Sequence, residues 1–417
     1  MTIKIRDPQK HDTPKGSFIT YLITTETEVK TFRSGPKPRP VRRRYQDFVW
    51  LRTTLAMTYP ACIIPPLPEK HRLEYIKGDR FGPDFIQRRL LSLQWFLERI
   101  SRHPILQQSE AVQIFLESND FKNDKRRQMS ILTEEPTSFL NSIGDTLINA
   151  FTTLKMPDER FEDMKENIER LEENLNTIER LYLRINKRQQ DLEHDYDNFA
   201  NSIQGLSALE QSITKPLHQF AETAKAFANV MKDMIEKEDA QFLNELHALL
   251  SYCHAAKDTL RARDQKQLDR EGLNYYLQQS YQLRDRLHSG SNNRKYNDIK
   301  GGMSGMIITD YVTDKLNEVR GVDKQRARRE KLARLDDRVK RLRHELEKTT
   351  DESMRFNKQV IKEFELFQQA KTLELKQSLI AYADCHIEFY QRGMAIWEKI
   401  IPILERMNDK SNDSMYS

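Results

Sequence analysis

The sequence predicts an α+β domain followed by an all-α region, which contains an amphipathic helix and three long antiparallel helices and forms a dimer. Three observations carry this prediction. Short alternating segments rich in Thr, Ile and Val lie in the first part of the chain, and apolar residues recur at heptad spacing from residue 158 onward. The 417 residues include only 13 glycines, and 31% of them are charged, which is typical of long charged helices.

The positive charge is concentrated near the N-terminus. Residues 1–122 carry 21 Lys and Arg against 13 Asp and Glu, a net charge of +8, whereas the whole chain has +5. A local excess of this kind indicates a site for an anion.

Composition also excludes several classes of protein. No apolar run is long enough to span a bilayer, and the N-terminal residues resemble neither a signal peptide nor a transit peptide. Cys62, Cys253 and Cys385 form no CxxC pair, so we expect a reducing, cytosolic compartment and no metal site. The sequence contains no hydrolase, zinc-peptidase or phosphate-loop motif, so we expect neither an enzyme nor a cofactor.

Residues 1–122 are predicted to form the α+β domain. Three short strands are expected at residues 2–7, 17–27 and 41–45, as a three-stranded antiparallel sheet. Helical spacing follows at residues 47–55, 81–104 and 109–118, and the prolines of 63–70 favour an extended polyproline II segment. The polar residues 123–136 are predicted as a linker.

Residues 137–154 are predicted as an amphipathic helix whose apolar residues share one stripe. The stripe includes Phe139, Ile143, Leu147 and Phe151. Such a helix suits insertion into a membrane interface, and it equally suits packing against the long helices. The sequence leaves the two alternatives open.

Residues 157–410 are predicted to form the three long helices. The first carries an almost unbroken heptad pattern from Phe161 to Leu206, and Pro216 marks the break before the second, which continues to about residue 287. The third starts near Lys324 and continues to about residue 408, after a segment of loop composition at 289–323. Three slender helices bury little apolar surface by themselves, so a second chain is expected to cover the rest.

Four motifs of the first domain occur in an order that resembles a known family. RRYQDF, IIPPLPEK, FIQRRLLSLQWFL and QIFLES are similar to the phox-homology (PX) domain, which binds phosphatidylinositol 3-phosphate. A PX domain followed by an amphipathic helix and three long helices resembles the sorting nexins with a C-terminal BAR domain. PPLPEK, GDRF and VRGVDKQRARREK are most similar to the sorting nexin-4 group.

The resemblance implies roles for five residues of the first domain. Arg44 would bind the 3-phosphate through its guanidinium fork, and Tyr45 would lie against the inositol ring. Lys70 would pair with the 1-phosphate, Arg89 with the ring hydroxyls at positions 4 and 5, and Gln46 stands where many relatives have a serine beside the phosphate. Arg42 and Arg43 are interpreted as general electrostatics.

Two further surfaces are candidates for membrane contact. In the family, the loop containing Leu73, Tyr75 and Ile76 enters the bilayer interface, although the sequence alone fits an ordinary packed loop as well. Residues 324–343 hold ten basic and three acidic residues, which suit contact with anionic lipid or a solvated helical face. The basic surface of the helical region is predicted to contain Arg261, Arg263, Lys266, Arg328, Arg329, Lys331 and Arg334.

The resemblance implies a peripheral membrane-coat protein that binds phosphatidylinositol 3-phosphate and senses or generates membrane curvature. It would act in endosome-to-Golgi recycling of cargo membrane proteins and in selective autophagy, on the cytosolic face of endosomes and at phagophore assembly sites. The expected partner is a second copy or another PX–BAR sorting nexin. The alternative is a coiled-coil scaffold whose first domain binds protein. Nucleic-acid binding is not expected, because no nucleic-acid module is present.

Overall fold

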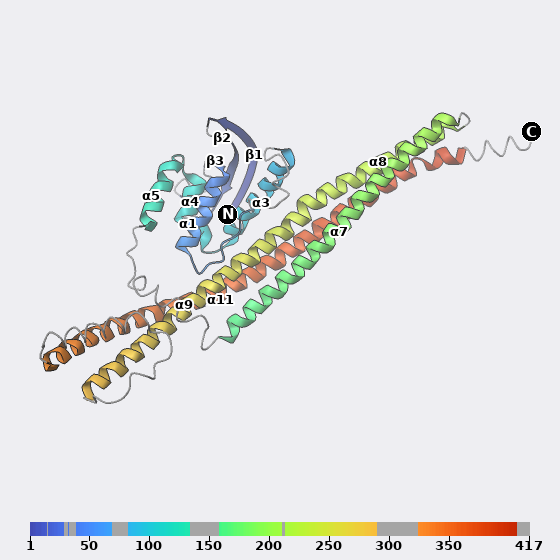
Figure 1. Ribbon diagram of the computed structural model, residues 1–417. Helices are drawn as coiled ribbons and strands as arrows, with labels where there is room; N and C mark the ends of the chain where they lie inside the picture. Colours follow the sequence, from blue (N-terminus) through green and yellow to red (C-terminus); the bar gives the residue numbers. More distant parts are fainter. Residues whose placement is uncertain are drawn as a thin grey trace, which may run out of the picture.

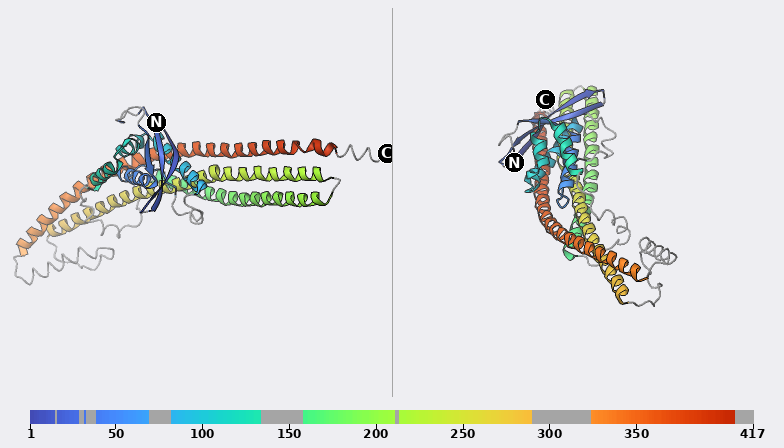
Figure 2. Two further views of the ribbon diagram at one scale, coloured as in Figure 1. Left: turned by 90° about the horizontal axis from the view of Figure 1, so that it is seen from above. Right: turned by 90° about the vertical axis from the view of Figure 1, so that its left-hand side faces the viewer.

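The computed structural model describes residues 1–14, 16–28, 32, 39–68, 82–133, 158–210, 213–289 and 324–406. In these ranges the chain forms a small α+β domain that lies beside the middle of a long helical body (Figure 1). Seen from two further sides, one arm of the body bends away from the rest (Figure 2).

The predicted three-stranded antiparallel sheet is confirmed. It consists of β1 (Thr2–Thr13), β2 (Gly16–Glu26) and β3 (Val41–Arg44), with β2 in the centre. Alternate side chains of β2 are buried, among them Tyr21 and Ile23, because neighbouring residues of a strand point to opposite faces of the sheet.

The three helices predicted for the first domain are also present. They are α1 (Tyr45–Thr58), α3 (Pro83–Arg102) and α4 (Glu110–Glu117), with the short 3-10 turn η1 (Leu106–Gln108) before α4. Phe48 of α1 lies between Phe96 and Phe115, with ring centroids 6.3 and 4.9 Å away. One apolar core therefore joins these helices to the sheet.

The linker predicted for residues 123–136 is wrong over the part that the structure describes. A further helix, α5 (Phe121–Thr133), occupies this segment. The Phe121 ring packs edge-on against Trp50 at 5.1 Å, and the Ser118 hydroxyl donates to Asp124 at 2.6 Å. The segment is polar in composition, but these contacts attach the helix to the domain. The amphipathic helix predicted at 137–154 lies outside the described residues.

The helical body contains the three predicted long helices. The first is α7 (Glu159–Leu209), where the Asp158 side chain accepts a hydrogen bond from the Arg160 amide at 3.2 Å and caps the helix. The second consists of α8 (Thr214–Glu238) and α9 (Asn244–Ser289), joined by the π-helical turn η2 (Asp239–Leu243). The third is α11 (Lys324–Glu398), with a short helical end as far as residue 406. The π-helical turn was not predicted.

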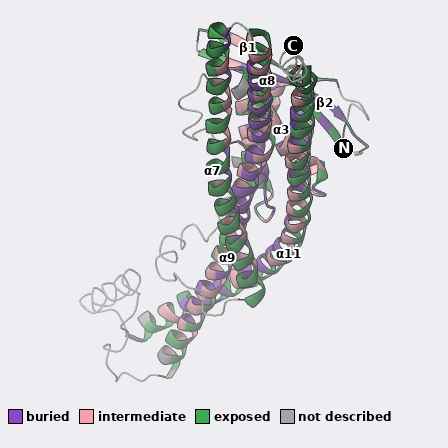
Figure 3. Ribbon diagram, turned by 90° about the vertical axis from the view of Figure 1, so that its right-hand side faces the viewer, coloured by how far each residue is buried: buried purple, intermediate pink, exposed green. Residues whose placement is uncertain are grey.

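The helical body buries only part of its apolar surface. On α7, Phe161, Ile168, Leu175 and Tyr182 are buried, whereas many other apolar residues of the heptad pattern face solvent (Figure 3). The exposed ones include Ile178, Ile185, Leu192, Phe199 and Leu206, and α11 adds Ile380, Ile387, Tyr390 and Met394. Contiguous apolar surface of this kind is typical of an interface with another chain.

Candidate functional site

The candidate site lies where β3 passes into α1. Arg42, Arg43 and Arg44 are consecutive at the end of β3, so their side chains alternate between the two faces of the sheet. Arg42 forms an ion pair with Asp7 and donates to the Asp7 carbonyl at 3.1 Å.

Arg43 is a structural residue. Its Nε donates to the Phe115 carbonyl at 2.9 Å and its Nη2 to the Ser118 carbonyl at 2.7 Å, so it binds the C-terminal end of α4. The guanidinium also lies 4.2 Å from the centroid of the Phe121 ring, and burial lowers the pKa of Arg43 to about 10. The interpretation of Arg43 as general electrostatics is therefore wrong, because its guanidinium binds carbonyl groups at the end of α4 and is not available to an anion in solvent.

Arg44 is the residue of the three whose side chain is half exposed, at 52%. It is the N-cap residue of α1, and its amide donates to Asp47 Oδ2 at 3.0 Å. Its Nε lies 3.8 Å from Asp47 Oδ1, and Lys125 Nζ approaches the same oxygen to 3.9 Å. Lys125 thus joins this basic site from α5. Sequence reasoning missed this residue because it did not predict α5.

Tyr45 and Arg89 meet on the other side of the site. The Tyr45 hydroxyl donates to the Pro68 carbonyl at 2.7 Å, and the Arg89 guanidinium lies 4.7 Å from the centroid of the Tyr45 ring. Phe85 supports the same guanidinium from one turn earlier on α3, at 4.2 Å. Sequence reasoning did not single out Phe85.

The structure therefore brings Arg44, Tyr45 and Arg89 to one edge of the first domain, and Gln46 is exposed in the first turn of α1. Lys70, Leu73, Tyr75 and Ile76 lie outside the described residues, as do Phe139, Ile143, Leu147 and Phe151. Exposed guanidinium groups beside a helix N-terminus favour an anion, because the helix dipole and the N–H groups add to the arginine charge.

The predicted basic surface of the helical body is only partly a surface. Arg263 is buried against the Phe161 ring, 3.9 Å from its centroid, and donates to Asn357 Oδ1 at 3.1 Å. Its assignment to the surface is wrong, because it joins α7, α9 and α11 from within. Arg261 is exposed beside Asp258, and Lys266 is half-buried with its Nζ 5.4 Å from the Phe356 ring centroid.

The basic residues of α11 lie near the end of the same arm. Arg328 donates to the carbonyls of Leu287 and His288, so it closes the C-terminal end of α9. Arg329 and Arg334 are exposed and Lys331 is partly exposed. A smaller cationic surface than the predicted one remains at this tip.

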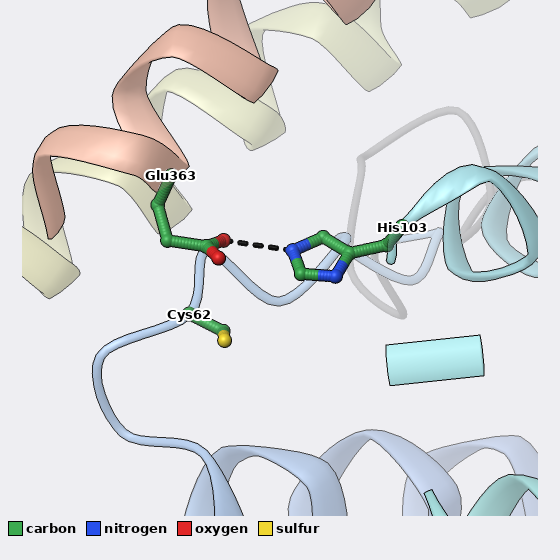
Figure 4. A group of neighbouring side chains, drawn as sticks. All are labelled: Cys62, His103 and Glu363. Carbon is green, nitrogen blue, oxygen red and sulfur yellow. Dashed lines mark hydrogen bonds and ion pairs between the residues drawn. The ribbon is translucent and has the colours of Figure 1, made fainter. Parts of the chain in front are cut away.

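Cys62, His103 and Glu363 bring three metal-type ligands together in the described part of the chain (Figure 4). Hydrogen bonds already account for two of them. His103 Nδ1 accepts from the amides of Ile105 and Leu106, both at 3.2 Å, so the ring proton lies on Nε2, which is 2.8 Å from Glu363 Oε2. Burial, and next the charge of Glu363, raises the pKa of the Cys62 thiol. The cluster is a hydrogen-bonded junction rather than a metal centre.

None of the helices in the described ranges has an apolar stretch that could cross a bilayer.

Comparison with protein families and known proteins agrees with this architecture. The family model described as PX domain matches residues 33–119, and the one described as Vps5 C terminal like matches residues 136–301. Sorting nexin-4 of Cryptococcus neoformans is 41% identical over 98% of this chain and 81% of its own length. Sorting nexin-4 of Gibberella zeae is 39% identical over 95% of this chain and 85% of its own.

A solved structure shares the whole fold. The cryo-EM structure of the SNX-BAR Mvp1 tetramer aligns with a TM-score of 0.60, covering 96% of this chain and 99% of that one, at 15% identity. The similarity concerns the fold alone.

Proposed function

Because the chain belongs to the sorting nexin-4 family and joins a PX domain to a BAR-like helical region, we propose that it binds phosphatidylinositol 3-phosphate and senses or generates membrane curvature. It is a peripheral membrane protein by family, and we place it on the cytosolic face of endosomes and at phagophore assembly sites. There it serves endosome-to-Golgi recycling of cargo membrane proteins and selective autophagy.

One observation carries the headgroup proposal. Arg44 presents a half-exposed guanidinium at the N-terminus of α1, and Arg89 is held against the ring of the next residue, Tyr45. In this arrangement Arg44 binds the 3-phosphate, Tyr45 packs on the inositol ring, and Arg89 donates to the ring hydroxyls. Gln46 donates from the first turn of α1, and Lys70, two residues after Pro68, pairs with the 1-phosphate. The phosphate competes with Asp47 for Arg44.

The helical body supports the proposal of a dimer. Its exposed apolar residues on α7 and α11 suit a second helical body, either a copy of this chain or another PX–BAR sorting nexin. A dimer carries two headgroup sites, so each attachment raises the effective concentration of the other at the membrane. The loop of Leu73, Tyr75 and Ile76, the 137–154 helix, and the cationic tip of α11 add contacts to the same bilayer.

Vesicle cosedimentation with phosphatidylinositol 3-phosphate and the other monophosphates tests this function in wild type, Arg44→Ala and Arg42→Ala. We expect selective binding in wild type and a loss of roughly 10- to 100-fold in Arg44→Ala, because a bidentate charge-assisted contact disappears. Arg42→Ala is the matched control and keeps the selectivity, since Arg42 is paired with Asp7. Equal binding to every anionic vesicle, unaffected by Arg44→Ala, would instead favour a protein-binding scaffold.

A further inference from the structure

The loop after α1 connects the two cores of the molecule. Cys62 belongs to the apolar core of the PX domain, whereas the next residue, Ile63, is buried in the core formed by α7, α9 and α11. Two adjacent residues therefore lie in different cores, so the PX domain packs against the helical body through this loop and is not joined to it by the chain alone.

A buried ion pair crosses the same junction. Arg99 of α3 donates to Glu374 of α11 through Nε at 2.8 Å and Nη2 at 2.7 Å, and the two side chains are only 5% and 6% exposed. The Tyr252 ring of α9 covers the guanidinium at 4.9 Å. Burial opposes the charge of Arg99, but Glu374 outweighs this effect and raises the pKa of Arg99.

A second buried pair lies four residues further along the chain, at His103, the C-cap residue of α3. His103 Nε2 donates to Glu363 Oε2 at 2.8 Å, and the Ile63 amide donates to the same oxygen at 3.1 Å (Figure 4). Gln359 donates to the other oxygen at 2.8 Å. Burial alone would raise the pKa of Glu363, yet the hydrogen bond and charge of His103 hold it below the usual value.

The two buried pairs lie at separate points of one contact. Arg99 is in the last turn of α3 and His103 is the residue directly after this helix, whereas Glu363 and Glu374 are eleven residues, about three turns, apart on one face of α11. Buried charged pairs contribute little net stability, because desolvation offsets their attraction, but they penalise every other arrangement of the two surfaces. Two buried pairs at separate points therefore favour one position of the PX domain on α11.

Arg89 of the candidate headgroup site lies on α3 as well, ten residues before Arg99. We propose that Arg99, His103, Glu363 and Glu374 form an interdomain latch that fixes the orientation of the headgroup site relative to the helical body. This inference rests on the proposed function. The four are positioning residues: they hold the headgroup site so that it reaches lipid only on membranes whose curvature also fits the helical body.

If the latch acts in this way, its variants lose the preference for vesicle curvature but keep the affinity for the headgroup. In Glu374→Gln and Arg99→Gln, affinity for soluble short-chain phosphatidylinositol 3-phosphate stays at the wild-type value. The ratio of affinities for small and large vesicles of equal lipid composition falls to about one, because a freed domain binds its lipid on any surface. Arg102→Gln, an exposed neighbour on α3 paired with Glu98, is the matched control and keeps the wild-type ratio.

The outcomes distinguish the latch from the function on which it rests. Wild type that fails to bind the soluble lipid would overturn the headgroup function. Wild type that binds it but shows no preference for vesicle size, or latch variants that keep the preference, would overturn the latch alone. The double variant Arg99→Glu, Glu374→Arg restores the pair and is expected to regain the preference.

Hydrogen exchange in wild type tests the latch without any substitution, should the variants fail to fold. The Ile63 amide donates to Glu363 across the junction, so a closed latch makes it exchange as slowly as the core amides of α3. Exchange as fast as that of an open loop, while α3 itself is protected, would show that the two domains separate freely and would overturn the proposal.

Discussion

Three consecutive arginines of one strand have three different environments. Arg42 forms a partly exposed pair with Asp7, Arg43 binds the end of α4 from inside the domain, and Arg44 is the N-cap residue of α1 with a half-exposed side chain. Position in the strand, rather than residue type, separates the structural arginine from the one available to a ligand.

Arg43→Met is expected to destabilise the PX domain by about 3 kcal/mol, because two buried carbonyls lose a charged donor. Arg42→Met is the matched control and is expected to cost less than about 1 kcal/mol, as exposed ion pairs do. Chemical denaturation followed by tryptophan fluorescence, to which Trp50 and Trp95 of this domain contribute, measures both. A loss in Arg43→Met no larger than that in Arg42→Met would contradict the structural role.

Glu238 is a buried acidic residue of the helical body. It is fully buried where α8 meets the π-helical turn, and its Oε1 lies 2.6 Å from His386 Nε2. Burial, and next the charge of Asp239, raises the pKa of Glu238 from 4.5 to about 7. The folded state therefore retains a proton that the unfolded chain releases, so this group lowers stability progressively as pH rises from about 4.5 to about 7.

Glu238→Gln keeps the shape of the protonated side chain and removes the titration. We expect the variant to be more stable than wild type by about 1–3 kcal/mol near pH 8. The difference shrinks towards about pH 4.5, where the Glu238 side chain of folded wild type is neutral as well. Denaturation midpoints of the two proteins across this range provide the comparison. A variant less stable than wild type near pH 8 would show that His386 stabilises the carboxylate instead.

At the residue scale, the sequence could predict which side chains are cationic but not which are buried. Motif order indicated Arg44, Tyr45 and Arg89, and the structure brings these three together. The burial of Arg263 depends on Phe161, which lies about a hundred residues away on another helix, and no local pattern encodes that contact. Sequence reasoning did not single out Phe85, because helical periodicity does not distinguish packing on a guanidinium from packing on apolar groups.

At the scale of elements, strong periodicity predicted β2, β3 and the long helices close to their observed bounds, whereas β1 continues beyond the predicted residues 2–7 as far as Thr13. α5 was missed because its composition is polar, and its docking depends on a few contacts such as Phe121 on Trp50. The π-helical turn adds one residue within one turn of an otherwise regular helix. This change barely alters the apolar periodicity, so the sequence pattern does not reveal it.

The exposed apolar face of α7 is the proposed dimer interface, and a charge placed there tests it. Phe199 is 45% exposed in the single chain, so Phe199→Glu should leave the helical fold intact while placing a charge in the proposed dimer interface. We expect a shift from dimer to monomer at equal concentration, measured by analytical ultracentrifugation, with unchanged helical circular dichroism.

Asn198→Glu is the matched control for this face, because Asn198 is exposed and points about 100° away around the helix. It should remain a dimer. Dissociation in both variants, or in neither, would contradict the assignment of the interface to this stripe.

At the scale of the whole molecule, the protein combines one small proposed headgroup site with a long helical body. One PX domain attaches to a membrane transiently, whereas two sites in one dimer attach together at high effective concentration. The position of the PX domain on α9 and α11 could not be predicted from the sequence, since Glu363 and Glu374 look like ordinary charged positions of a heptad helix. Only the fold places them against Arg99 and His103.

The most direct test of this account is equilibrium binding to vesicles containing phosphatidylinositol 3-phosphate, compared between wild type, Phe199→Glu and Arg44→Ala. We expect the monomeric Phe199→Glu variant to keep its lipid selectivity but to bind at least about tenfold more weakly than wild type, because avidity is lost. Arg44→Ala should lose the selectivity while remaining a dimer. Equal binding by all three proteins would contradict the claim that paired headgroup sites hold this protein on the membrane.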